Sequence, residues 1–185
     1  MDKGNDNGGA GKPASGEVTA QPTTGAAAAA PGRKAAARFE RYTQDFTQAV
    51  TVLARDAGYK NLRLADLEWL VVPPLLVGQV RIALTRATPE APLVPSAVAL
   101  WARVSAEVDK RLTENLDKPP LLGLREWNSG DIIWLITLAG EAKALATLVP
   151  QLQQTVFKDR PVKIRVQDKA GKTIVQVMPP PAAKA

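Results

Sequence analysis

The sequence predicts one domain of the mixed α/β or α+β class, a sheet flanked by helices. Three observations predict it. Stretches in which apolar residues recur every three or four positions are interspersed with stretches of alternating apolar residues. One run, residues 132–138, is almost wholly apolar, which is typical of a strand covered on both faces. The chain of 185 residues is long enough to bury a sizeable core as a single domain.

The two ends of the chain are expected to lie outside this domain. Residues 1–34 are rich in Gly, Ala, Pro and Thr and have almost no bulky apolar side chains. Such a segment cannot offset the entropy of ordering its backbone, so we predict a disordered tail. The domain then covers residues 35–178, and residues 179–185 form a short flexible tail.

Helical periodicity begins at residue 35. Five apolar residues spaced by three or four positions form one face of the first predicted helix: Phe39, Tyr42, Phe46, Val50 and Leu53. Gly58 suits the C-terminal end of that helix. A second apolar segment follows over residues 64–72, and the pair Pro73-Pro74 is expected to end it, because a residue before proline is pushed out of the helical region.

The middle of the chain predicts a strand pair and a helix. Residues 79–86 alternate apolar and polar side chains, a turn covers residues 88–92, and residues 94–101 return as a second strand, so an antiparallel pair is expected. Residues 103–116 carry a helical stripe and precede the chain break at Pro119-Pro120.

The last third centres on residues 126–140. Four turn-favouring residues, 128–131, feed the apolar strand at 132–138. A helix is predicted over residues 141–154, with Pro150 expected to bend or shorten it. Two alternating strands, residues 162–166 and 173–177, are joined by a turn around Gly171 and predict a hairpin.

Composition removes several classes of chemistry. The chain has no cysteine and no histidine, so disulfides, thiolate nucleophiles, Ser-His mechanisms and the usual zinc sites are excluded, and no metal site is expected. The net charge of +6 suits an acidic partner. No signal-peptide pattern or membrane-length apolar run is present, so a cytoplasmic protein without a membrane span is expected.

The central turn and strand also carry a family resemblance. Trp127, Ser129, Gly130, Asp131 and Trp134 match, in type and spacing, the active-site region of the RTX toxin-activating lysine acyltransferases. The similarity extends from about Gly58 to Val177 and includes Pro74. As residues alone, the tryptophans suit a core or a pocket wall, and Asp131 suits a turn.

The resemblance implies a GNAT-like acyltransferase fold. It also implies transfer of a fatty acyl group from acyl carrier protein to lysine side chains of a protein acceptor, an RTX-type protoxin in this family. No cofactor is expected beyond the acyl carrier protein donor. Whether two copies associate as a homodimer stays open. Nine basic residues are candidates for contact with the acidic carrier: Arg81, Arg86, Arg103, Lys110, Arg111, Lys158, Arg160, Lys163 and Arg165.

The family's catalytic pair is a histidine and an aspartate, and this sequence replaces both. Counting six residues on from Asp131 places the aspartate position at Thr137. Counting fourteen residues back from Pro74 places the histidine position at Lys60, next to Tyr59. The acceptor ammonium must lose a proton before it attacks a thioester, and an imidazole held by a carboxylate does this near neutral pH. No catalytic residue of the family is therefore intact.

Three interpretations follow. The chain has lost catalysis and keeps the fold as a binding or adaptor module, or it uses another base, for which Lys60, Tyr59, Asp131 and Glu126 are candidates. In the third, the resemblance concerns structure only. Nucleic-acid binding is a separate class, and the sequence lacks a glycine-rich phosphate loop, an aromatic RNA-binding run and a basic recognition helix.

Overall fold

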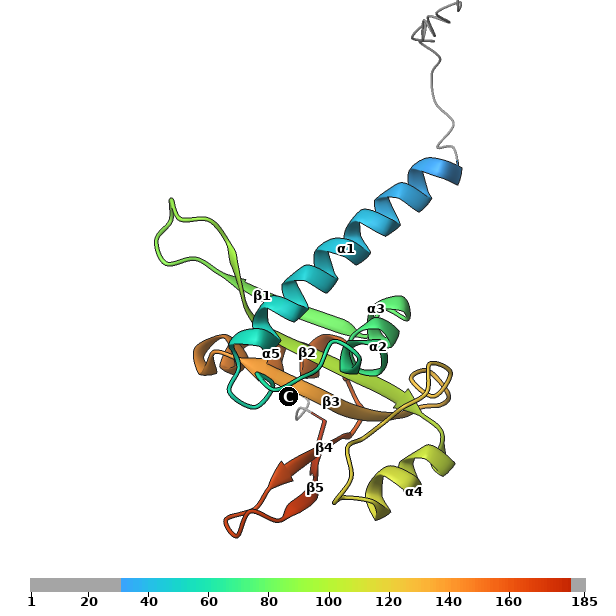
Figure 1. Cartoon of the computed structure of the whole chain (residues 1–185). Helices are drawn as coiled ribbons and strands as arrows, with labels where there is room; N and C mark the ends of the chain where they lie inside the picture. The colour runs from blue at the N-terminus through green and yellow to red at the C-terminus, as the bar shows by residue number, and fades with distance from the viewer. Residues whose placement is uncertain (1–30, 181–185) are drawn as a thin grey trace, which may run out of the picture.

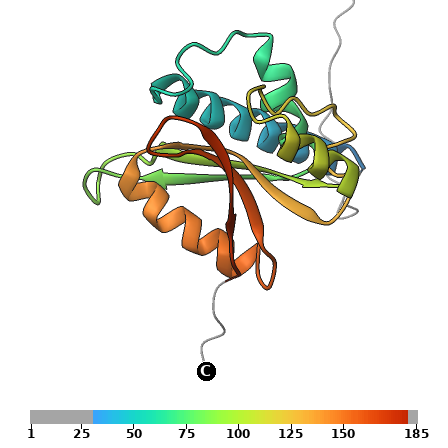
Figure 2. The same cartoon turned by 90° about the horizontal axis from the view of Figure 1, so that it is seen from below.

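The structure is a computed structural model and describes residues 31–180, a five-stranded sheet with helices on both faces (Figures 1 and 2). The elements in chain order are α1 (Pro31–Arg55), α2 (Asp66–Leu70), α3 (Val72–Leu76), β1 (Val80–Thr85), β2 (Val94–Val104), α4 (Ala106–Glu114), β3 (Ile132–Gly140), α5 (Ala142–Thr155), β4 (Val162–Gln167) and β5 (Thr173–Met178). The predicted tails at residues 1–30 and 181–185 lie outside the described residues.

The strands follow one another across the sheet in chain order, β1-β2-β3-β4-β5. All neighbouring strands are antiparallel except β3 and β4, which run parallel. The apolar run predicted to be central is β3, the third strand of five. The expected mixed α/β class, with a mixed sheet flanked by helices, is therefore confirmed, as are the predicted antiparallel pair β1–β2 and the hairpin β4–β5.

Helices cover the two faces unequally (Figure 2). Helix α5 covers one face, where Leu148 and Leu152 pack against Trp101 of β2 and Leu135 of β3. The other face is covered at one end by α1 to α3 and at the other end by α4. Both faces of β2 and β3 are covered, and nearly every residue of these strands is apolar. Burial on both faces was predicted for residues 132–138 of β3.

Several predicted boundaries are wrong. Helix α1 begins at Pro31 and not at Ala35. The segment at 64–72 is not ended by the prolines: α2 stops at Leu70, and Pro73 and Pro74 lie in the first turn of α3. A proline is tolerated there because its missing N–H has no partner in the first turn of a helix. Helix α5 spans nearly the predicted residues and continues through Pro150 to Thr155, so Pro150 does not shorten it.

The end of β2 was also misassigned. Residues 103 and 104 were predicted to begin a helix, but they extend β2, and Ser105 is the N-cap of α4. The Ser105 hydroxyl accepts a hydrogen bond from Val108 N at 3.3 Å. Within residues 31–180, no helix has the length and apolar character required to cross a membrane.

Candidate functional site

The turn that carries the family motif is held against the end of β2 by backbone hydrogen bonds. Arg103 N donates to Trp127 O at 2.9 Å, and Arg103 O accepts from Ser129 N at 2.8 Å and Gly130 N at 3.1 Å. Arg103 and Asn128 thereby form a short parallel bridge. These bonds hold the turn that immediately precedes β3 in the chain.

Two small residues of the motif shape this contact. Ser129 Oγ accepts a hydrogen bond from Ser105 N at 2.9 Å and donates to Glu126 O at 3.0 Å. A Cβ atom on Gly130 would lie 2.5 Å from the Val104 carbonyl oxygen, so only glycine fits. Both residues serve the junction between β2, α4 and β3.

The two tryptophans of the motif are core residues. Trp127 and Trp134 are fully buried beneath α4. Trp134 Nε1 donates to Asp109 Oδ1 at 2.7 Å, and the Lys163 ammonium both pairs with Asp109 at 2.7 Å and lies 5.7 Å from the Trp134 ring centre. This group ties α4 to β3 and β4. Of the two roles that the sequence suggested for the tryptophans, core residue and pocket wall, their burial fits the first.

Asp131 is the exposed acidic residue of the motif. Its carboxylate accepts hydrogen bonds from Arg103 at 2.8 Å and Arg160 at 3.3 Å. These guanidinium groups hold the pKa of Asp131 below its ordinary range. A carboxylate with a lowered pKa is a weaker base. Asp131 forms a surface ion-pair cluster with the two arginines at the start of β3.

Thr137 lies on β3 next to a β-bulge. Leu135 pairs with Trp101 and Thr137 with Leu100, so Ile136 is an additional residue on β3. The bulge turns Thr137 toward the face covered by α1 to α3. The pairing of β3 with β4 ends at Leu135, so Thr137 lies beyond the parallel segment, where the two strands are no longer paired.

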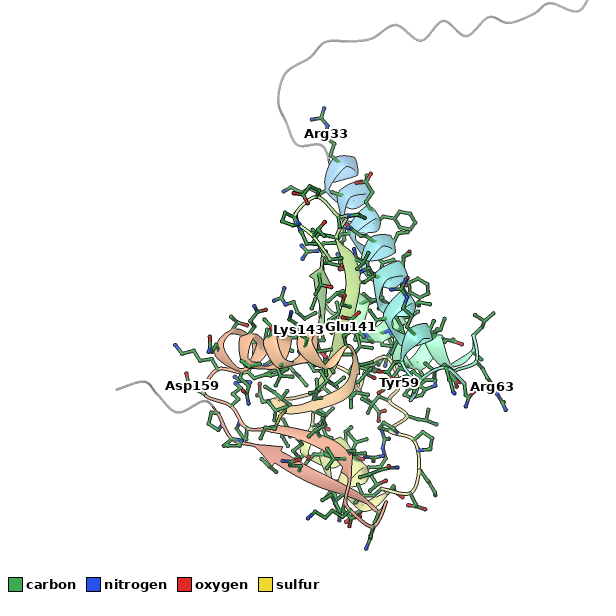
Figure 3. The ribbon with its side chains drawn as sticks, turned by 90° about the vertical axis from the view of Figure 1, so that its left-hand side faces the viewer. Arg33, Tyr59, Arg63, Glu141, Lys143 and Asp159 are labelled. Atoms are coloured by element: carbon green, nitrogen blue, oxygen red, sulfur yellow. The ribbon has the colours of Figure 1, made fainter. Side chains whose placement is uncertain are left out.

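The side chain that meets Thr137 is Tyr59. The Tyr59 hydroxyl interacts with the Thr137 hydroxyl and the Leu138 backbone. Burial raises the pKa of Tyr59 above the ordinary value of a phenol; Thr137 acts against this, and the Asp56 carboxylate raises the pKa again. Figure 3 shows Tyr59 where the end of α1 meets the sheet, whereas Arg63 points outward.

Thr137 itself is 1% exposed, and its Oγ1 forms no hydrogen bond of ordinary geometry with any residue from 31 to 180. The approach of Tyr59 is thus close but not a well-formed hydrogen bond. A buried hydroxyl without a good partner is uncommon in a folded core. The position expected for a carboxylate therefore holds a buried threonine whose hydroxyl has no well-formed hydrogen bond.

Lys60, the expected histidine position, is exposed, and its neighbour Tyr59 takes the place beside Thr137. The count of fourteen residues was made from Pro74, and the same count from Pro73 ends at Tyr59. Two consecutive prolines made the alignment ambiguous by one residue. In the structure, Tyr59 and not Lys60 lies beside Thr137.

Sequence reasoning missed Asp56, which joins the end of α1 to the end of β3. Its Oδ2 accepts a hydrogen bond from Gly140 N at 2.9 Å, and its Oδ1 accepts from Gly58 N at 2.8 Å. The second contact is local, and an aspartate two residues before a glycine is a recognisable turn pattern. The first joins residues far apart in sequence and had no local indication.

The candidate base Glu126 is also occupied. Arg111 donates to Glu126 Oε2 at 2.8 Å, and Gly123 N donates to the same oxygen at 2.8 Å. The Arg111 hydrogen bond holds the pKa of Glu126 below its ordinary range. Within residues 31–180, no three histidine, cysteine or acidic side chains gather as metal ligands would.

The fold is a mixed α/β domain, in which the motif residues form the junction between β2, α4 and β3. A family model for the RTX toxin acyltransferase family matches residues 40–180. The match covers most of the chain, so the protein belongs to that family, whose members are toxin-activating acyltransferases. None of the curated proteins compared with the chain matches it.

Proposed function

We propose that this chain is a member of the toxin-activating acyltransferase family in which acyl transfer is lost or strongly impaired, and that it acts as a binding module on the family fold. The observation that carries the proposal is the contact between Tyr59 and Thr137. Thr137 is the position counted for the aspartate, and Tyr59 is adjacent to Lys60, the position counted for the histidine. The absence of histidine from the whole sequence supports it independently.

The chemistry of the reaction explains the expected loss. A lysine ammonium needs a base that accepts its proton near neutral pH. A tyrosine whose pKa is raised stays protonated there, and a threonine hydroxyl does not accept the proton. Asp131 and Glu126 have lowered pKa values and arginine partners, and Lys60 is exposed. None of the candidate bases has the combination of position and pKa that the imidazole supplies.

Family membership implies an acyl donor and a protoxin acceptor in general terms. Acyl carrier protein is the donor we propose as a partner, and the net charge of +6 supports contact with that acidic protein. The alternative within the same family is an active enzyme with an unrecognised base. Nucleic-acid binding has no support among the contacts described above.

A transfer assay tests the proposal. Purified protein is mixed with fatty acyl carrier protein and a lysine-bearing RTX repeat protein, and acyl-lysine is measured by mass spectrometry. We expect no acyl-lysine above the level of a reaction without the protein. Turnover that disappears in Tyr59→Phe or Glu126→Gln would instead identify a base and refute the loss of catalysis.

A gain-of-function comparison tests the assignment of positions. The variant Tyr59→His with Thr137→Asp restores an imidazole and a carboxylate where the two side chains meet. Its matched control, Lys60→His with Thr137→Asp, places the same two groups at the positions counted from Pro74. We expect acyl-lysine from the first variant only. Activity in the control alone would show that the residue pair has been assigned wrongly.

A further inference from the structure

The first part of α1 extends beyond the sheet and is covered by little else in the described chain (Figure 1). Residues 32–41 are all exposed, and the first fully buried residue of the helix is Ala49. Residues 31–39 also precede the part of the chain that matches the family. Short helices that bury no face are only marginally stable in water, so a partner would stabilise this segment.

An apolar groove of about 990 Å³ runs along this exposed segment. One wall is α1, which contributes residues at helical spacing from Ala35 to Asp45, and the other wall is formed by α3, the turn after it and β1. Phe39 is 69% exposed, Leu76 is 48% exposed and Val77 is 37% exposed. Large apolar side chains gathered at this exposure mark an interaction surface rather than ordinary solvated surface.

The rim of the groove is positively charged. Its ionisable lining residues are Arg38, Arg41 and Arg81 against the single acid Asp45. Arg41 and Asp45 lie 3.9 Å apart and partly neutralise each other. Arg38 and Arg81 have no acidic side chain within ion-pair distance among residues 31–180. Two arginines at the rim of this apolar channel therefore have no salt-bridge partner within the described part of the chain.

We infer that this groove docks an acidic amphipathic helix of a partner protein. The helix would place its apolar stripe on Phe39, Leu76 and Val77 and its acidic flanks on Arg38 and Arg81. The lining of α1 spans about three helical turns, roughly 15 Å, which matches a helix packed alongside. A symmetric contact between the grooves of two copies is disfavoured, because it would bring the same two arginines of each copy against each other.

This inference goes beyond the proposed loss of catalysis and does not depend on it, because docking requires no base. The test is binding of three synthetic peptides of about 20 residues to the full-length protein. One peptide has a leucine stripe with glutamate flanks, the second has lysine in place of glutamate, and the third scrambles the first. Fluorescence anisotropy of the labelled peptides reports the dissociation constants.

We expect the acidic amphipathic peptide to bind at least about tenfold more tightly than the other two, and to weaken as salt is raised. Phe39→Ala with Arg81→Glu should weaken binding by about tenfold or more. The matched control, Leu124→Ala with Arg125→Glu, changes an exposed leucine and arginine outside the groove and should leave binding unchanged. Circular dichroism confirms that both variants remain folded.

Four results would overturn the inference. The first is binding of the acidic peptide that Phe39→Ala with Arg81→Glu does not change. Another is equal binding of the lysine peptide, which would remove the role of the arginines. The third is a dimer in light scattering that Phe39→Ala dissociates, because the groove would then belong to a second copy. Sedimentation with anionic vesicles, without peptide binding, would likewise assign the surface to lipid.

Discussion

Gly130 is a residue of the family motif whose role is steric: it leaves room for a neighbouring backbone. Its Cα faces the Val104 carbonyl and the Ser105 backbone, and an added Cβ would lie 2.5 Å and 2.7 Å from their nearest atoms. Gly130→Ala should therefore lower the free energy of unfolding by about 1–3 kcal/mol, because backbone must move to admit the methyl group. Urea unfolding followed by tryptophan fluorescence measures the change.

The control for this prediction is Gly123→Ala in the preceding loop. A Cβ there meets only the Glu126 side chain, at an ordinary contact distance of 3.6 Å. We expect a change within about 0.5 kcal/mol. If the two alanine variants unfold at the same urea concentration, the motif glycine is not a packing requirement.

Thr137 gives a second prediction at the scale of one side chain. Because its buried Oγ1 has no good hydrogen-bond partner, Thr137→Val should stabilise the fold by about 1 kcal/mol. Thr85→Val is the contrasting variant, since Thr85 Oγ1 bonds to Ser96 Oγ at 2.5 Å and its loss should destabilise. Thermal unfolding of both variants checks the opposite signs. Destabilisation by Thr137→Val would show that Tyr59 satisfies the hydroxyl.

Sequence reasoning could pick out residues that belong to one structural site where a motif fixed their spacing. Trp127, Ser129, Gly130 and Trp134 were recognised in this way, and they form one junction. The partner of Thr137 was not predictable, because the count depended on which of two prolines was chosen. Asp56 could not be found either, because its bond to Gly140 spans 84 residues.

At the scale of elements, the loop before β3 is tied to α4 by one ion pair, between Arg111 and Glu126. The pKa of Glu126 is lowered, so the folded state binds its proton less readily than the unfolded state does. The stability from this contact is present above the unfolded pKa, near 4.3, and is lost as pH falls through the lower folded pKa. Its magnitude is about 1 kcal/mol, because the Arg111 side chain is half exposed.

Urea unfolding measured from about pH 7 down to about pH 3 tests this contact. Glu126→Gln should lose about 1 kcal/mol at pH 7, and the difference should shrink as pH falls below the unfolded pKa and through the lowered folded pKa of Glu126. Other lowered carboxyls, such as Asp131, titrate equally in both proteins and cancel in the difference. A difference that stays constant with pH would assign the loss to packing.

Element types were largely predictable because apolar periodicity follows burial, but junctions were not. Arg103 was placed in a helix, although its backbone pairs with the motif turn and extends β2. Pro73 was expected to stop a helix and instead lies in the first turn of α3. The bulge at Ile136 has no sequence pattern, since it lies within a run in which nearly every residue is apolar. Tertiary pairing decides all three.

At the scale of the molecule, the sequence pattern yields a mixed α/β class and the motif yields the family. The pattern does not reveal that a β-bulge and the end of α1 meet at Tyr59, because that requires the folded sheet. The described fold holds Tyr59 and Thr137 side by side, and neither is a histidine or an aspartate. Under the proposed function the fold persists without catalysis, because stability and catalysis can depend on different residues of one domain.

The extent of the folded unit leads to a last prediction. Because residues 32–41 are exposed and the family match begins at residue 40, a chain that starts at Glu40 should unfold cooperatively. Its free energy of unfolding should lie within about 0.5 kcal/mol of the full chain. A chain that starts at Leu53 removes Ala49 and Val52, both buried, and should lose several kcal/mol or fail to fold. Urea unfolding compares the three chains, and a large loss on removing residues 1–39 would show that the exposed part of α1 supports the core.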